Sequence, residues 1–108
     1  MALKHAQSGE LIDIRPLGSA LSGAATRTLV KTETLEIVRL VMRSGKAHHA
    51  HKVPGEITVQ SLEGRCSFTA AGVTRDLEPG HLMYLAGGEE HSLHATEDCS
   101  ILLTILLK

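Results

Sequence analysis

Aromatic residues are nearly absent from this chain of 108 residues, which has one Phe, one Tyr and no Trp. Proteins that stack nucleic-acid bases or enclose quaternary ammonium groups rely on aromatic platforms and cages. An excess of positive charge is also lacking, since 11 Lys and Arg residues stand against 12 Asp and Glu residues. Because a phosphate backbone is bound chiefly through such an excess, the composition argues against nucleic acid as a partner.

Cysteines and long apolar runs are scarce as well. Cys66 and Cys99 are too few for a disulfide framework and do not form a Cys-x-x-Cys pair. Their neighbours predict reduced thiols that are buried as small apolar groups. The first nine residues lack the apolar core of about 7–15 residues found in secretory signals, and no run reaches the roughly 18 apolar residues of a membrane span. We therefore expect a soluble, cytoplasmic protein with no membrane partner.

What the sequence does contain is a series of short apolar runs separated by turn residues. The runs are Leu11–Ile14, Thr26–Lys31, Leu35–Arg43, Ile57–Leu62, Cys66–Ala71, Val73–Leu77, Leu82–Leu85, His91–Ala95 and Ile101–Leu107. Helical periodicity is not sustained over any window of about 10–12 residues. About eight or nine short strands at close spacing are typical of an all-β sandwich or barrel. Gly72, between two of these runs, predicts a hairpin.

The last run, Ile101–Leu107, is apolar on both faces of the strand it predicts. A strand with one face in water would not need Leu102 and Leu106. The second face is therefore expected to be covered, and a chain this short leaves little of itself to cover it. We predict a homodimer, because an exposed apolar patch of this kind marks an interface. The alternative is a central strand covered by the N-terminal arm.

Seven histidines are many for this length, and they are unevenly placed. Imidazole is the commonest metal ligand in proteins. The segment Gly45-Lys46-Ala47-His48-His49-Ala50-His51-Lys52-Val53-Pro54-Gly55-Glu56, with the run that follows it to Gly64, resembles the first motif of the cupin family. The segment Gly80-His81-Leu82-Met83-Tyr84-Leu85-Ala86-Gly87-Gly88-Glu89-Glu90-His91 resembles the second.

The resemblance covers the chain from about Leu35 to Leu107. It implies an all-β fold, the cupin-type double-stranded β-helix or jelly-roll barrel. In that single domain, residues 1–33 are the N-terminal arm and first strands, and residues 34–108 are the barrel core. The family commonly holds a divalent metal inside the barrel mouth, and its members include dioxygenases, isomerases and decarboxylases.

The first motif can be placed on the sequence in two registers. In one, His51 stands at the first histidine position, and Val53 and Ile57 replace the second histidine and the glutamate of the family. In the other, His49 and His51 are the histidine pair and Glu56 is the carboxylate. Glu56 alternates with the apolar Ile57 and would share the polar face of the strand. A slip that turned it inward would expose apolar side chains at about 1.5–3 kcal/mol each. The pleat favours the first register, unless a bulge after Pro54 and Gly55 re-aims Glu56.

The second motif places His91 where the family has its last metal ligand, whereas Ala86 and Ala95 replace its proline and asparagine. His51 and His91 then remain of the four family ligands, and a competent site has at least three. His49 is the best third candidate, and His48 and Glu56 are weaker ones. The metal would be Zn, Ni, Fe or Mn.

The remaining histidines are expected outside the site. His81 lies in a predicted exposed turn, and His5 lies in the N-terminal segment. His94 has the opposite parity to His91, so it should face outward.

Val53 and Ile57 would make the barrel mouth more apolar than a four-ligand site. Together with Tyr84 they are the expected lining of a pocket for a small, partly apolar ligand. The sequence thus supports a small-molecule-binding barrel with a His-coordinated divalent metal, and assigns no catalytic residue. The alternative is a minimal metal-dependent enzyme of dioxygenase, isomerase or decarboxylase type. In a third reading, His51 and His91 are hydrogen-bonded core residues.

Overall fold

The computed structural model describes residues 4–108, and for residues 49–51 it describes the backbone alone. Along these residues run one short 3₁₀ helix, η1 (Gly18–Gly23), and nine strands. The strands are β1 (Arg27–Lys31), β2 (Leu35–Met42), β3 (Ala47–His51), β4 (Ile57–Glu63), β5 (Cys66–Ala70), β6 (Val73–Leu77), β7 (Leu82–Leu85), β8 (His91–Ala95) and β9 (Cys99–Leu106).

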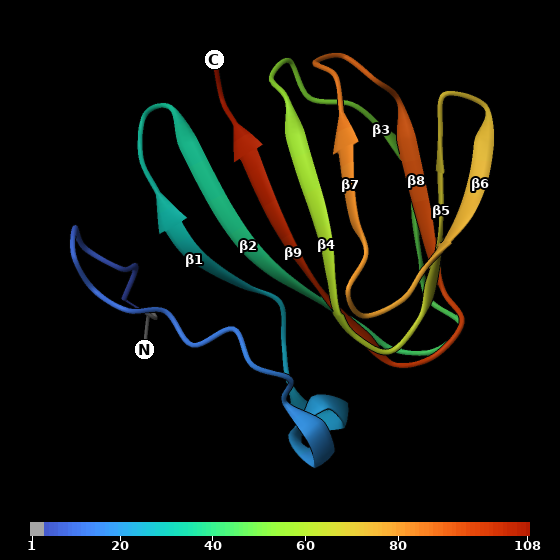
Figure 1. Cartoon of the computed structure of the whole chain (residues 1–108), viewed down its shortest axis with the longest axis horizontal. Helices are drawn as coiled ribbons and strands as arrows, with labels where there is room; N and C mark the ends of the chain where they lie inside the picture. Colours follow the sequence, from blue (N-terminus) through green and yellow to red (C-terminus); the bar gives the residue numbers. More distant parts are fainter. Residues whose placement is uncertain (1–3) are drawn as a thin grey trace.

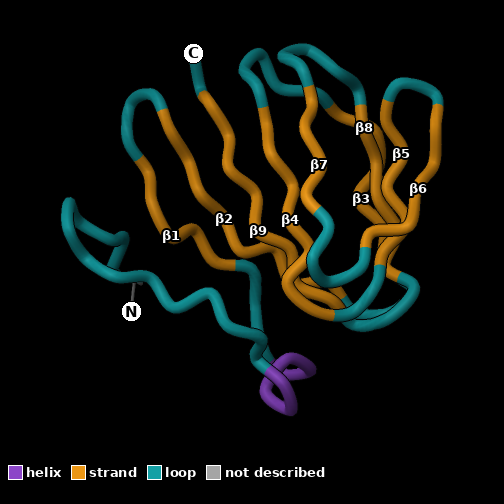
Figure 2. The backbone as a smooth tube through the Cα atoms, in the orientation of Figure 1, coloured by secondary structure: helices purple, strands orange, loops and turns teal. Residues whose placement is uncertain are grey.

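The strands form two sheets that face each other (Figure 1). The larger sheet has the order β1-β2-β9-β4-β7, and the smaller has the order β3-β8-β5-β6. Every paired strand is antiparallel to its neighbour. Figure 2 shows these strands in orange, with the 3₁₀ helix lying outside both sheets. The all-β prediction is confirmed.

The hydrophobic core lies between the two sheets. Alternate residues of each strand point into it, so Ile57 and Val59 are buried while Thr58 and Gln60 lie on the other face of β4. Phe68 from the smaller sheet and Ile101 from the larger are fully buried. The alternation read from the sequence therefore assigned the inner face of β4 correctly.

The hairpin predicted at Gly72 joins β5 to β6. Its two turn residues, Ala71 and Gly72, have φ values of 52° and 76°. Two consecutive positive φ angles are the geometry of the tight turn that matches the twist of an antiparallel pair. The prediction of a hairpin at this position is confirmed.

Two segments differ from the sequence-based expectation. The run Leu11–Ile14 was predicted as a strand, but it is irregular in the structure, and the side chain of Leu11 is 100% exposed. An apolar run becomes a strand only where another strand completes its backbone hydrogen bonds, and no described strand pairs with this segment. Conversely, residues 47–51, which lie outside the predicted strand runs, form β3, a strand paired with β8.

A buried ionic network ties the N-terminal arm to the outer face of the larger sheet. Arg39 Nη2 lies 3.2 Å from Glu63 Oε2 and donates to the backbone oxygen of Arg15 at 2.7 Å. The Ser100 hydroxyl donates to the same Glu63 oxygen at 2.6 Å. The backbone N–H of Leu17 donates to both Glu63 oxygens, at 2.9 and 3.0 Å. The arm, blue in Figure 1, is thereby fastened where it leads into η1.

Glu63 reaches this outer face because of a β-bulge. The pairing of β4 with β9 passes from Ser61↔Ile101 directly to Glu63↔Ser100. The extra residue, Leu62, shifts Glu63 to the face opposite that of Ser61. Burial alone would raise the pKa of Glu63, but hydrogen bonds from Leu17, Ser100 and the Gly18 N–H, with the charge of Arg39, outweigh burial and lower that pKa.

The outer face of β9 is covered at one end. Ser100 is completely buried beneath Arg39 and the arm, whereas Leu106 at the other end is 39% exposed. The N-terminal arm therefore covers part of this face, which was the alternative to a homodimer. That a second copy of the chain covers the rest of the face remains a prediction.

In the part of the chain that the structure describes, no helix has the length and apolar character needed to cross a membrane.

Candidate functional site

A small cavity of about 160 Å³ lies inside the barrel, between the two sheets. Two histidines line it, His48 of β3 and His91 of β8. The other lining residues among those described are apolar, namely Leu40, Val53, Ile57, Val59, Phe68, Leu93, Leu103 and Ile105. The cavity is thus an apolar hollow in which two imidazoles are the polar groups among the described side chains.

His91 is the most constrained of these groups. It is only 7% exposed, and its ring stacks on Phe68 with the centroids 5.7 Å apart and the planes 12° from parallel. Its Nδ1 lies 3.1 Å from the backbone oxygen of Glu89. Since a carbonyl oxygen only accepts, Nδ1 must carry the hydrogen in this contact. In the neutral ring Nε2 is then the nitrogen with the lone pair, which can accept a proton donor or bind a metal.

The pairing of β3 with β8 brings a second histidine position next to His91. Ala47 pairs with His94 and His48 with Leu93, and the next pair is His51 with His91. The pairing advances from His48 to His51 on β3 but only from Leu93 to His91 on β8, so β3 holds an extra residue in a bulge. Positions 48 and 51 therefore both stand opposite residues that line the cavity.

His51 and His49, two of the three predicted metal ligands, have side chains outside the described residues. The backbone places His51 directly opposite His91 and His49 within the bulge. The third predicted ligand, His91, lines the cavity. His48, which the sequence ranked lower, also lines the cavity, although it is exposed to solvent.

Two of the three predicted pocket residues lie in the cavity lining. Val53 and Ile57, at the positions where the cupin motif has a histidine and a glutamate, both face the hollow. The neighbouring Glu56 is exposed and does not line the cavity. This agrees with the register in which Val53 and Ile57, and not Glu56, stand at the family's ligand positions. The apolar character of these two positions is therefore a property of the site itself.

Tyr84, the third predicted pocket residue, is absent from the lining of the cavity and 60% exposed. Its neighbour Leu85 is the residue of β7 that turns into the core. The Tyr84 hydroxyl instead donates to Glu56 Oε2 at 2.5 Å. This hydrogen bond, with smaller contributions from desolvation and the carboxylate charge, raises the pKa of Tyr84.

The described side chains supply two imidazole donors to the cavity. Among the described residues no group of three or more His, Cys, Asp or Glu side chains is placed to hold a metal. A protein metal site of the zinc type has at least three protein ligands. The donor set fits a metal only if His51 or His49 adds the third imidazole.

The other predicted outward histidines are where the sequence put them. His94 of β8 is exposed, and His81 is exposed in the turn before β7. The backbone N–H of Glu78 donates to His81 Nδ1 at 3.1 Å. His5 is also exposed.

The Arg39–Glu63 pair is the feature that sequence reasoning missed. Both side chains are nearly buried, at 8% and 11% exposure. Arg39 lies inside the apolar run Leu35–Arg43, and a buried arginine needs a paired carboxylate. The sequence could therefore have predicted an ion pair at Arg39. The bulge that turns Glu63 toward Arg39 has no recognisable pattern in the sequence, so the partner of Arg39 could not be identified.

No family model matches the sequence, and no curated protein matches it either. Solved structures do match. A conserved protein of unknown function from Streptococcus pyogenes is 21% identical, with a TM-score of 0.78 over 100% of this chain and 96% of that chain. A cupin superfamily protein from Desulfitobacterium hafniense is 18% identical, with a TM-score of 0.79 over 95% and 100%. A predicted oxalate decarboxylase from Thermotoga maritima is 24% identical, with a TM-score of 0.69 over 77% and 79%. At such identities the likeness establishes the fold.

Proposed function

We propose, on the premise that this chain has the cupin fold, that its barrel is a binding site for a small, partly apolar molecule. The observation that carries the proposal is the cavity between the sheets, where the exposed His48 and the buried His91 lie among apolar side chains. Pockets of this composition, mostly apolar with a few placed polar groups, are typical of small-molecule sites.

The lining of the cavity determines what the ligand must offer. His48 and His91 are the groups among the described side chains that can take part in a hydrogen bond with the ligand, and Nδ1–H of His91 is directed at the Glu89 carbonyl. Val53 and Ile57 replace the polar family ligands by apolar surface. The preferred ligand is therefore small, has one hydrogen-bond donor and carries its remaining surface as hydrocarbon or an aromatic ring.

A titration with phenol tests this proposal, because phenol has one donor and an apolar ring. Saturable amide shifts in β3, β4 and β8 are expected in ¹H–¹⁵N spectra. His91→Leu should weaken binding about tenfold, the equivalent of one hydrogen bond. Val53→Phe, which fills the cavity mouth, should abolish binding, and His94→Leu, exposed on the same strand, should leave it unchanged. Shifts elsewhere, or equal binding by all variants, would contradict the proposal.

A second candidate function, a metal-dependent enzyme, is favoured by the register that sets His51 opposite His91. The donors would be His48, His51 and His91, with His49 as the remaining imidazole of the bulge. A divalent metal, Zn, Ni, Fe or Mn, would supply a Lewis acid if these imidazoles held it. The likeness to a predicted oxalate decarboxylase adds support, and would make small carboxylates the substrate class.

Metal analysis separates the two candidates. For the enzyme, protein purified without chelator or affinity nickel should carry about one metal ion per chain, as three imidazole ligands predict. The metal should be lost in His51→Ala and His91→Ala and kept in His94→Ala. Folded protein without metal would exclude the second candidate and leave the first intact.

We also propose that the chain acts in the cytoplasm as a homodimer, joined through the outer face of the larger sheet. Gln60 pairs with both Leu82 and Leu102, so these two leucines flank it on that face. Leu82 is largely exposed, and Leu106 extends the same apolar surface. An exposed apolar patch of this kind is typical of an interface.

Sedimentation velocity tests the dimer. We expect Leu82→Glu and Leu102→Glu to convert a dimer into a folded monomer, because each introduces a charge into the apolar interface. Leu11→Glu, on the fully exposed arm, is the matched control and should remain dimeric. A monomeric wild-type protein would refute the dimer.

A further inference from the structure

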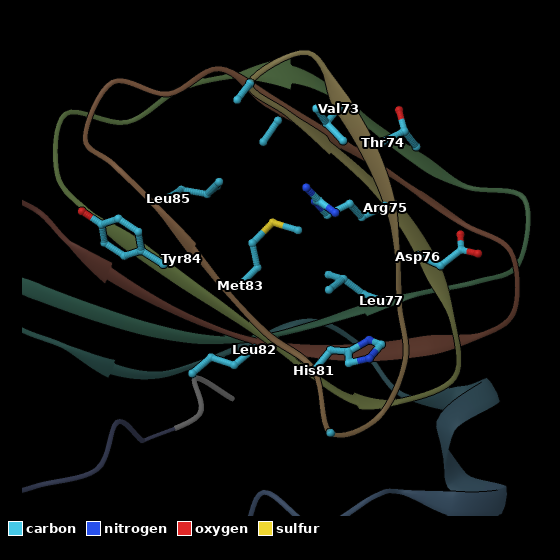
Figure 3. A pocket seen from close by; sticks show the side chains of 13 residues that line it. Val73, Thr74, Arg75, Asp76, Leu77, His81, Leu82, Met83, Tyr84 and Leu85 are labelled. Atoms are coloured by element: carbon cyan, nitrogen blue, oxygen red, sulfur yellow. The ribbon is translucent and has the colours of Figure 1, made fainter.

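The open side of the barrel lies between the edges of the two sheets. β6 ends the smaller sheet and β7 ends the larger one. Between these two strands runs a groove of about 890 Å³, shown from close by in Figure 3. Its lining shares no residue with the lining of the barrel cavity. The groove is therefore separate from the site of the proposed function.

The walls of this groove are apolar where the strands turn toward each other. Leu77 of β6 and Leu85 of β7 belong to the buried core and fix the inner parity of each strand. Val73 shares the parity of Leu77, and Met83 shares that of Leu85. Val73 remains exposed, and Met83 is half-buried. This wall offers hydrocarbon surface to a ligand.

Arg75 is the exception on this inner parity. It lies between Val73 and Leu77 on β6, and Figure 3 shows it pointing into the groove toward Met83, while Thr74 and Asp76 turn away. The acidic residue of the lining is thus directed to the opposite face. Arg75 therefore lies among apolar residues on the inner side of β6, in a groove whose lining also includes His81 and Tyr84.

The Arg75 side chain has no hydrogen-bond or ion-pair partner among the described residues, and it is exposed to the groove. Three arginines are paired, Arg15 with Asp13, Arg39 with Glu63 and Arg65 with Glu78, whereas Arg27 and Arg43 resemble Arg75 in having no ion pair among the described residues. A guanidinium presents a planar fork of donors that matches a carboxylate with two parallel hydrogen bonds.

We propose that this groove binds a small monocarboxylate with a short apolar tail. The carboxylate pairs with the Arg75 guanidinium, and the tail lies on Val73, Met83 and Leu85. The positive charge complements the anion, and partial enclosure by apolar side chains strengthens the pair relative to one in open water. A neutral or cationic ligand of the same shape lacks this partner.

Hexanoate is the probe, followed by ¹H–¹⁵N spectra at concentrations up to about 5 mM, a range that detects weak millimolar binding. Saturable amide shifts are expected along β6 and β7. Arg75→Gln should weaken binding at least about tenfold, and Arg75→Lys, which keeps the charge without the fork, should be intermediate. Arg43→Gln removes the same charge from an exposed turn residue and should change nothing.

Hexanol and hexylammonium provide the chemical controls, since they carry the same tail with no negative charge. Each should bind at least about tenfold more weakly than hexanoate. Three results would overturn the proposal: no saturable binding, equal binding of hexanoate and hexanol, or equal binding by Arg75→Gln and the wild type. Shifts in β6 and β7 that follow protein concentration instead of hexanoate would assign the groove to a second copy of the chain. Because the phenol titration maps to β3, β4 and β8, failure of one proposal is distinguishable from failure of the other.

Discussion

Replacing Gly64 with alanine should destabilise the protein by more than about 3 kcal/mol, enough to unfold a barrel of ordinary stability at moderate temperature. Gly64 has φ of +75°, and a Cβ atom there would lie 2.0 Å from the backbone oxygen of Asp98 and 2.7 Å from Cα of Cys99. Backbone atoms cannot move aside as a flexible side chain can. The turn from β4 to β5 can therefore pack closely against the start of β9 only because Gly64 has no side chain.

Gly72 provides the matched control for this prediction. Its φ of +76° is nearly the same, but a Cβ atom there would meet nothing within 4 Å. Gly72→Ala should therefore cost only about 1 kcal/mol, the strain of a left-handed backbone. The difference between the two variants in urea-induced unfolding isolates the close packing. Equal losses of stability would contradict the packing of β4, β5 and β9 described above.

Replacing Glu63 with glutamine is expected to destabilise the protein by about 3 kcal/mol, because it leaves the buried Arg39 guanidinium without its counter-charge. It also weakens the acceptor of the Leu17 and Ser100 hydrogen bonds, which hold the arm. Amide hydrogen exchange should increase first around Leu17 and Gly18. Glu78→Gln, in the half-exposed pair with Arg65, should cost less than about 1 kcal/mol. If Glu63→Gln lowered the free energy of unfolding by no more than Glu78→Gln does, the buried network would contribute little to stability.

The same network predicts a pH dependence. The folded state lowers the pKa of Glu63 below its ordinary value of 4.5, so the folded state favours the ionised form. The stabilisation is therefore fully present above about pH 4.5 and is lost as the pH falls through the lower pKa of the folded state. The free energy of unfolding should differ between wild type and Glu63→Gln at neutral pH, and the difference should shrink in acid. A difference that grows as the pH falls would contradict the direction of this shift.

Features that depend on local alternation could be predicted from the sequence. The inner face of β4 follows from the period of two residues, which Ile57 and Val59 obey. The same rule places Val53 and Ile57 on the cavity and Glu56 outside it. Strict attention to parity would also have removed Tyr84 from the pocket, since it adjoins the core residue Leu85.

Features created by bulges could not be predicted this way, because one extra residue reverses the alternation. In β3 a bulge brings positions 48 and 51, rather than 49 and 51, opposite the cavity-lining residues of β8. In β4 another bulge turns Glu63 outward to meet Arg39. The irregular course of Leu11–Ile14 has a related origin, since pairing partners are set by topology and not by the apolar run itself.

The proposed function requires that a small molecule binds inside the barrel, against His91. A crystal structure of the protein soaked with 4-bromophenol tests it most directly, because the anomalous scattering of bromine locates the ligand without ambiguity. We expect a bromine peak within the hollow bounded by His48, Val53 and Phe68, with the ligand hydroxyl close to the imidazoles that line it. A barrel without bromine, or bromine bound only on the outer faces of the sheets, would contradict it.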